Sequence, residues 1–211
     1  MRIALIHAVR VAMPPVEDAF TRHWPQAERI NLLDDALSVD RERAGALTVE
    51  LSARISALAN YAISAGASGI LYTCSAFGEA IEAVQARVRM PVLKPNEAMF
   101  AEALALGARL GLLATFPASI GSMAKELKAL APHVELETAC VPQALTALQA
   151  GDGAQHDALL AAVAPKLGHC DALMLAQFST ARARDALAAV VECPVLASPD
   201  SAVLAMRRRL S

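Results

Sequence analysis

The sequence predicts an α/β fold made of two pseudo-symmetric lobes, each with a mainly parallel sheet flanked by helices. Three observations support this prediction. Short apolar runs of strand length alternate with helical patterns along the whole chain. The 211 residues are 55% hydrophobic but only 4% aromatic, a composition that suits helices packed on a parallel sheet. Finally, the second half of the chain repeats the pattern of the first.

The repeat is clearest near the end of each half. The segment Met90-Pro91-Val92-Leu93 resembles Cys193-Pro194-Val195-Leu196. The spacing from Cys74 to the first of these segments equals the spacing from Gln177 to the second. Agreement in both spacing and local sequence indicates two copies of one structural unit.

The repeat divides the chain into two lobes. We expect the first lobe at residues 1–96, with a C-terminal helix at 200–211 packing back on it, and the second at residues 97–199. The lobes should enclose an active-site cleft, with Cys74 and Gln177 at matching strand ends.

Local patterns give the elements of the first half. Apolar runs at 3–6 and 70–73 have the length of strands buried on both faces. Residues 48–65 place apolar side chains at helical spacing and end before Gly66. Residues 34–40 are polar and predict a loop, a candidate lid. The expected strands are 3–6, 28–33, 70–73 and 92–93, and the expected helices are 17–24, 48–65, 79–87 and 97–106.

The second half follows the same order. An apolar run ends at Gln177, and the Gly151-Asp152-Gly153 segment separates two helices. Asp200 or Ser201 should cap the last helix. The expected strands are 110–114, 134–139, the run before Gln177 and 195–196, and the expected helices are 118–130, 144–149, 154–166, 183–191 and 200–209.

Composition excludes several classes of function. A formal net charge of −2 offers no broad basic surface for nucleic acid or anionic lipid. No apolar stretch reaches the length of a membrane span, and Arg10 comes too early for a signal-peptide core, so we expect a cytoplasmic protein. The four cysteines lack metal-ligand or CxxC spacing, and the first strand is not followed by G-x-G-x-x-G. We therefore expect no metal site, no disulfide framework and no dinucleotide cofactor.

Ligands of open parallel sheets bind beyond the carboxyl ends of the strands. The residues expected at those ends are His7, Cys74, Lys94, Thr115, Cys140, Gln177 and Ser179. Cys74 leads this set because it lies between a strand and a helix, where the helix N-terminus should lower the pKa of a thiol. The N–H groups of Ser75 and Ala76 could hold a substrate carboxylate beside it. His7 is either a proton shuttle or a hydrogen-bonded residue of the cleft wall.

The segment Thr73-Cys74-Ser75-Ala76 resembles the first motif of the aspartate/glutamate racemase superfamily, which includes hydantoin racemase, maleate isomerase and arylmalonate decarboxylase. The second family motif, a strand followed by Gly-Cys-Thr, aligns with Ala176-Gln177-Phe178-Ser179, so Gln177 replaces the second catalytic cysteine. Thr115 is similar to a carboxylate-binding threonine of the family. The resemblance implies two similar lobes, PLP-independent chemistry without cofactor or metal, a small carboxylate substrate and a homodimer.

We therefore predict a cofactor-independent racemase or isomerase that acts on a small carboxylic acid through proton transfer by Cys74. His7 is the second catalytic candidate. The predicted substrate-binding residues are Ser75, Ala76, Thr115, Gln177, Phe178 and Ser179. Glutamine cannot exchange a proton with carbon, so a decarboxylase or cis-trans isomerase with a single thiol is an alternative. The same residues would also suit a non-catalytic carboxylate-binding protein, or a thiol hydrolase in which His7 is the base of Cys74.

Overall fold

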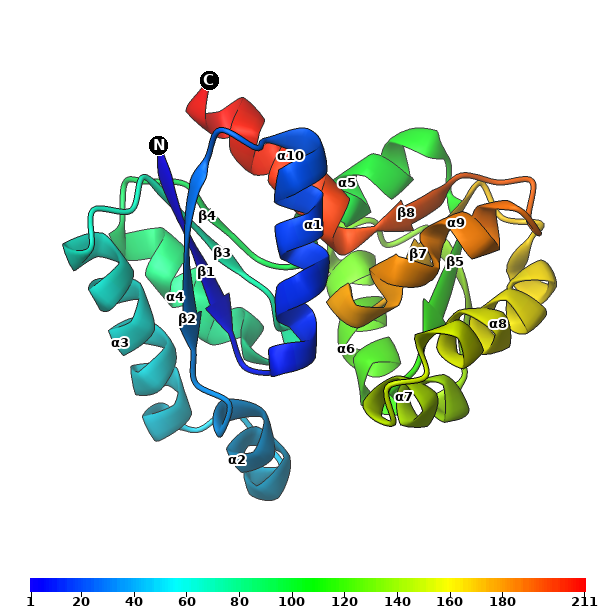
Figure 1. Cartoon of the computed structure of the whole chain (residues 1–211), viewed down its shortest axis with the longest axis horizontal. Coiled ribbons are helices and arrows are strands. Elements are labelled where there is room, and N and C mark those ends of the chain that lie inside the picture. The colour runs from blue at the N-terminus through cyan, green and yellow to red at the C-terminus, as the bar shows by residue number, and fades with distance from the viewer. The chain divides into compact units, whose positions relative to one another are not determined.

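The computed structural model describes the backbone of residues 1–211 and all side chains except that of residue 118. It contains two parallel sheets of four strands, in the orders β2-β1-β3-β4 and β6-β5-β7-β8 (Figure 1). The chain divides into two compact units, one formed by Met1–Ala98 with Ala202–Ser211 and the other by Met99–Ser201. The α/β fold with a parallel sheet in each half is confirmed.

The first unit is built around β1. This strand pairs in parallel with β2 on one side and with β3 on the other. The strands are β1 (Arg2–His7), β2 (Glu28–Leu33), β3 (Gly69–Tyr72) and β4 (Val92–Leu93). The helices are α1 (Met13–His23), α2 (Leu37–Ala44), α3 (Val49–Ser64) and α4 (Gly78–Arg87), with 3₁₀ turns at Arg10–Ala12 and Ser75–Phe77. The next helix, α5 (Glu97–Leu106), begins in this unit and continues into the second.

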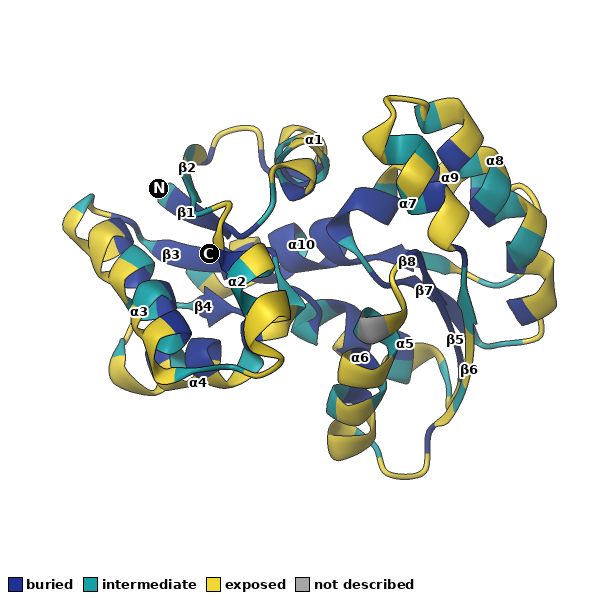
Figure 2. Ribbon diagram, turned by 90° about the horizontal axis from the view of Figure 1, so that it is seen from below, coloured by how far each residue is buried: buried dark blue, intermediate teal, exposed yellow. Residues whose placement is uncertain are grey.

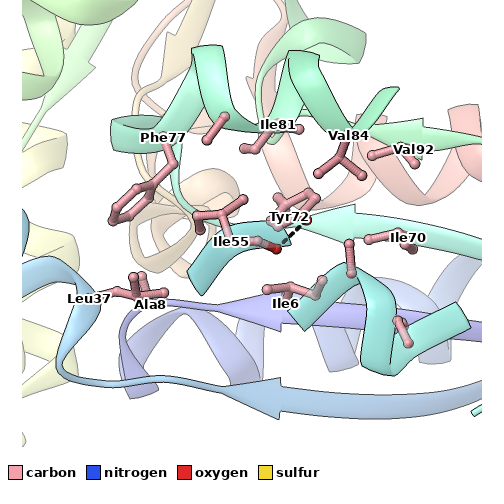
Figure 3. Packing of buried hydrophobic residues seen from close by; sticks show 14 of the residues in the cluster. Ile6, Ala8, Leu37, Ile55, Ile70, Tyr72, Phe77, Ile81, Val84 and Val92 are labelled. Carbon is pink, nitrogen blue, oxygen red and sulfur yellow. Dashed lines mark hydrogen bonds between the residues drawn. The ribbon is translucent and has the colours of Figure 1, made fainter. Parts of the chain in front are cut away.

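The core of this unit explains why the central strands β1 and β3 are largely apolar. Ile3 to Ile6 are buried, because helices cover both faces of a parallel sheet. Tyr72, at the end of β3, is buried between helices, and its hydroxyl donates a 3.1 Å hydrogen bond to the carbonyl of Ile55 in α3 (Figure 3). The register pairs Ile6 with Tyr72, so the ends of β1 and β3 lie side by side.

The second unit repeats this topology around β5. The strands are β5 (Arg109–Ala114), β6 (Glu135–Cys140), β7 (Ala172–Leu175) and β8 (Val195–Ala197). The helices are α6 (Pro117–Leu130), α7 (Pro142–Gln149), α8 (Gly153–Val163) and α9 (Arg184–Ala188), with 3₁₀ helices at Ala164–Leu167 and Phe178–Ala183. The last helix, α10 (Ser198–Leu210), begins in this unit and continues into the first. In both units the buried residues concentrate on the strands other than the edge strands β2 and β6, and the outer faces of the helices are exposed (Figure 2).

The C-terminal part of α10 belongs to the first unit. Arg207 donates a 2.8 Å hydrogen bond to the carbonyl of His23, and Arg209 forms a 2.9 Å ion pair with Glu97. The basic end of α10 therefore has specific partners in addition to its favourable position in the helix dipole. No helix in the described part of the chain has both the length and the apolar character needed to cross a bilayer.

The predicted loop at 34–40 is wrong, because α2 begins at Leu37. Leu37 is the only buried residue of this helix, so its sequence carries no amphipathic signal. Tertiary ion pairs hold the helix instead. Arg54 of α3 lies 2.6 Å from Asp34 and 2.7 Å from Asp40. Gly45, with a φ of 67°, then ends α2 in the left-handed conformation that glycine adopts without strain.

Candidate functional site

Cys74 lies where β3 gives way to helical structure. The N–H of Thr73 donates a 3.0 Å hydrogen bond to the carbonyl of Ile6 and so extends the ladder between β1 and β3 by one residue. Cys74 follows with an extended backbone, and the 3₁₀ turn Ser75–Phe77 separates it from α4, which begins at Gly78. The strand-to-helix corner that the sequence predicts is therefore present, with a short 3₁₀ turn between its two parts.

Three polar groups lie near the sulfur of Cys74. The backbone N–H of Ala76 and the hydroxyl of Ser38 act on it as hydrogen-bond donors, and the charge of Arg41 acts through space. Ser38 and Arg41 both belong to α2, where residues three positions apart lie on one helix face. Neither residue is among those predicted from the sequence, because the segment that forms α2 has the polar composition of a loop. Their spacing would have placed them together on a helix.

Burial raises the pKa of the Cys74 thiol above its ordinary value, although Ala76, Ser38 and Arg41 each act to lower it. The expected shift of this pKa toward the thiolate is therefore wrong. Cys74 precedes a single 3₁₀ turn rather than α4 itself, so it lies outside the first turn of the longer helix, where the dipole acts most strongly. Desolvation then outweighs the nearby donors. Cys74 rests as a thiol at neutral pH and has a proton to give.

Arg41 is half-buried and lies beside this thiol. Its Nε donates a 3.4 Å hydrogen bond to the carbonyl of Ala76. The other arginine near it in α2, Arg43, pairs with Asp40. Arg41 has no ion pair with a carboxylate among the residues that the structure describes, so its charge is available to an anionic ligand.

His7 is fully buried at the end of β1. Its Nδ1 lies 2.9 Å from Oγ1 of Thr73, and its Nε2 lies 2.8 Å from Oδ1 of Asn31 in β2. Burial lowers the pKa of His7, so the ring is neutral at physiological pH. No hydrogen bond joins His7 to Cys74 in the described residues. Hydrolysis by a His7-activated thiol therefore lacks the contact between base and nucleophile that it needs.

Gln177 occupies in the second unit the place that Cys74 has in the first. The N–H of Ala176 donates to the carbonyl of Leu113 at 3.0 Å, as the N–H of Thr73 donates to Ile6. Cys74 follows Thr73, and Gln177 follows Ala176. Both Cys74 and Gln177 have an extended backbone and directly precede a 3₁₀ helix. The equivalence that the repeat indicates between Cys74 and Gln177 is thus present in the topology of the two sheets.

Thr115 holds the side chain of Gln177. The N–H of Thr115 lies 3.1 Å, and the hydroxyl of Thr115 3.4 Å, from Oε1 of Gln177. This oxygen accepts a hydrogen bond from each group. The Nε2 group of Gln177 is buried and has no partner among the described residues. An unsatisfied buried donor costs about 1–3 kcal/mol, so an acceptor atom of a ligand would be favourable there. Thr115 acts here on Gln177, and its two donors are already in use.

The remaining candidates have diverse surroundings. Ser75 is half-buried and Ala76 is exposed, whereas Phe178 and Ser179 are buried. Lys94 lies 2.8 Å from Glu82, and burial raises the pKa of Cys140. Within the described residues, no group of three or more His, Cys, Asp or Glu side chains is arranged to hold a metal ion.

Comparisons with known proteins agree with this architecture. A family model described as Asp/Glu/Hydantoin racemase matches residues 13–167. Glutamate racemase isoform RacE1 from Bacillus anthracis has a TM-score of 0.75 at 14% identity, over 99% of this chain and 80% of that chain. Allantoin racemase from Klebsiella pneumoniae has a TM-score of 0.75 at 18% identity, over 100% of this chain and 87% of that chain. Picrophilus torridus aspartate racemase has a TM-score of 0.74 at 16% identity, over 98% of this chain and 93% of that chain. A search of curated proteins finds no significant match. These solved structures share the fold of the chain.

Proposed function

The chain belongs to the Asp/Glu/Hydantoin racemase family, and we propose on this premise that it is a cofactor-independent enzyme that acts on a small carboxylic acid through Cys74. The observation that carries the proposal is the group of residues around the thiol. Arg41 supplies a cation without a carboxylate partner among the described residues, and Ser38 and the N–H of Ala76 supply hydrogen-bond donors. Together these groups suit a substrate carboxylate whose neighbouring carbon faces the sulfur.

In this proposal Cys74 transfers the proton. A substrate that loses CO₂ leaves an electron pair on the carbon beside the remaining carbonyl group, and positioned donors stabilise the resulting enolate-like charge. The proton of the Cys74 thiol then passes to that carbon, and the thiolate later recovers a proton from water. The raised pKa of Cys74 suits this order of events, because the resting residue carries the proton that the intermediate needs.

The proposed chemistry takes place on one face of the substrate carbon. Racemisation by two bases requires a second group that exchanges protons with carbon. At the position equivalent to Cys74 the chain has Gln177, whose amide donates and accepts hydrogen bonds but does not ionise. These two observations favour a decarboxylase or an isomerase with a single thiol over a racemase with two thiols.

Turnover in D₂O tests the proposal. The wild-type protein and the Cys74→Ser variant are incubated with a panel of small monocarboxylates, dicarboxylates, amino acids and α-substituted malonates, and products are followed by NMR and chiral chromatography. We expect one acid to give product carrying a single deuterium with one handedness, and Cys74→Ser to abolish the reaction.

Three outcomes would contradict this proposal in different ways. A racemic product with full α-exchange would show that a second exchanging group exists and would refute reaction on one face. Turnover that persists in Cys74→Ser would remove Cys74 from the chemistry. Binding of a panel acid without turnover, unchanged in Cys74→Ala, would instead identify a carboxylate-binding protein on the same fold.

A further inference from the structure

A chain of hydrogen bonds connects the surface of the first unit with the residue before Cys74. It runs from Arg29 through Glu17 and Asn31 to His7 and ends at Thr73. The distances are 2.8 Å from Arg29 Nε to Glu17 Oε2, 2.7 Å from Asn31 Nδ2 to Glu17 Oε1, 2.8 Å from His7 Nε2 to Asn31 Oδ1 and 2.9 Å from His7 Nδ1 to Thr73 Oγ1. Its last two members, His7 and Thr73, are buried.

The donors and acceptors of this chain determine where the protons lie. The Glu17 carboxylate only accepts, so Asn31 must direct its Nδ2 toward Glu17 and its Oδ1 toward His7. The Nε2 of His7 then carries a hydrogen. Because the buried ring is neutral, Nδ1 is an acceptor, and the hydroxyl of Thr73 donates to it. His7 is thus held in one tautomer and one orientation.

Thr73 is held to β1 at two points. Its backbone N–H donates to the carbonyl of Ile6 at 3.0 Å. Its hydroxyl donates to His7, the next residue of β1, at 2.9 Å and has a longer contact of 3.3 Å with the carbonyl oxygen of Ile6. Cys74 comes directly afterwards, so the direction in which its side chain leaves the sheet depends on the backbone of Thr73. The hydroxyl of Thr73 thereby joins the Cys74 corner to a ring that Asn31 and Glu17 keep in place.

We propose that His7 is a positioning residue, which orients the corner between Thr73 and Cys74 through the hydroxyl of Thr73. This inference rests on the proposed function, because the corner matters to catalysis only if Cys74 does the chemistry. His7 acts without contact with the thiol, since its two ring nitrogens are occupied by Thr73 and Asn31. The sequence leaves two roles open for His7, a proton shuttle or a hydrogen-bonded structural residue, and the hydrogen bonds favour the second.

Two substitutions of His7 provide a matched pair. In His7→Asn the side-chain amide lies near the former Nδ1 position, so it reaches Thr73 but not Asn31. In His7→Gln the amide lies near the former Nε2 position, so it reaches Asn31 and leaves the Thr73 hydroxyl with only its longer 3.3 Å contact to the carbonyl of Ile6. Each variant loses one hydrogen bond, so their effects on stability should be similar. A second pair is Thr73→Ser, which keeps the hydroxyl, and Thr73→Val, which replaces it with a methyl group of similar shape.

The readout is the second-order rate of iodoacetamide labelling at Cys74, measured by peptide mass spectrometry without substrate. Cys140 in the same protein is the internal reference. Cys74 is half-buried, and loss of the Thr73 hydrogen bond should make its thiol more accessible to the reagent. We expect His7→Gln and Thr73→Val to raise Cys74 labelling about fivefold, the factor that one hydrogen bond of about 1 kcal/mol gives. His7→Asn and Thr73→Ser should stay within about twofold of wild type.

Thermal unfolding of all four variants serves as the stability control. Equal labelling of Cys74 in His7→Asn and His7→Gln would overturn the proposal, and so would equal labelling in Thr73→Val and Thr73→Ser. Labelling requires no turnover, so these outcomes are independent of the catalytic role of Cys74. Failure of the proposed function would appear separately, as turnover that persists in Cys74→Ser. If Cys74 is catalytic and His7 positions it, His7→Gln should lower kcat with little change in KM, whereas His7→Asn should keep kcat close to that of the wild type.

Discussion

Arg54 attaches α2, and with it Ser38 and Arg41, to the rest of the first unit. The guanidinium group makes three hydrogen bonds of 2.6 to 2.8 Å, two to Asp34 and one to Asp40. A third of the Arg54 side chain is exposed, so solvent screens these pairs, and we assign the network about 1–2 kcal/mol. The Arg54→Met substitution removes the charge but keeps most of the stem.

Because α2 buries only Leu37, a loss of this size should open the helix locally without unfolding the protein. Hydrogen exchange followed by mass spectrometry measures this directly. We expect the amides of α2 to exchange roughly 5–30 times faster in Arg54→Met, while those of β1 and β3 keep their protection. Arg43→Met is the matched control, because Arg43 makes a single ion pair with Asp40 and is largely exposed.

Three results would refute this reasoning. Unchanged protection of α2 in Arg54→Met would show that the ion pairs contribute nothing to holding the helix. Faster exchange throughout the first unit would show that Arg54 stabilises the fold rather than α2 alone. An equal effect of Arg43→Met would mean that general charge, and not the specific contacts of Arg54, governs the helix.

Three further predictions concern the site. A bound carboxylate should protect Cys74 from iodoacetamide, and Arg41→Met should weaken the apparent affinity of that carboxylate about tenfold, with partial recovery in Arg41→Lys. An unchanged protection curve would show that Arg41 does not bind the carboxylate. Iodoacetamide labelling of Cys74 should keep rising with pH beyond 9.0, the ordinary thiol pKa, because burial raises the pKa of this group; a plateau near neutral pH would contradict that shift. Burial lowers the pKa of His7 in the folded protein below 6.5, its ordinary value. Above pH 6.5 the ring is neutral in both the folded and the unfolded protein; as the pH falls below 6.5 the unfolded protein binds the proton first, so the folded protein loses stability. Between pH 7 and pH 5 the unfolding temperature should therefore fall less for His7→Gln than for wild type. Equal falls would refute the lowered pKa of His7.

Sequence pattern alone determined the fold class and the position of the main candidate residue. Strands buried on both faces appear as short apolar runs, because helices cover a parallel sheet on both sides. The ends of parallel strands lie at one edge, so the run before Cys74 placed that residue at the edge where ligands bind. The repeat placed Gln177 at the equivalent position, and the sheet topology confirms this equivalence.

The tertiary structure decided what surrounds those positions. α2 is a helix because Arg54, which belongs to another helix, binds Asp34 and Asp40, and no local pattern contains that information. The pKa of Cys74 is raised because desolvation outweighs the nearby donors, a balance that depends on packing. His7 bonds to Thr73, which is distant in sequence and adjacent only across the sheet. Local periodicity records which faces are buried, whereas hydrogen-bond partners and desolvation arise only when distant segments meet.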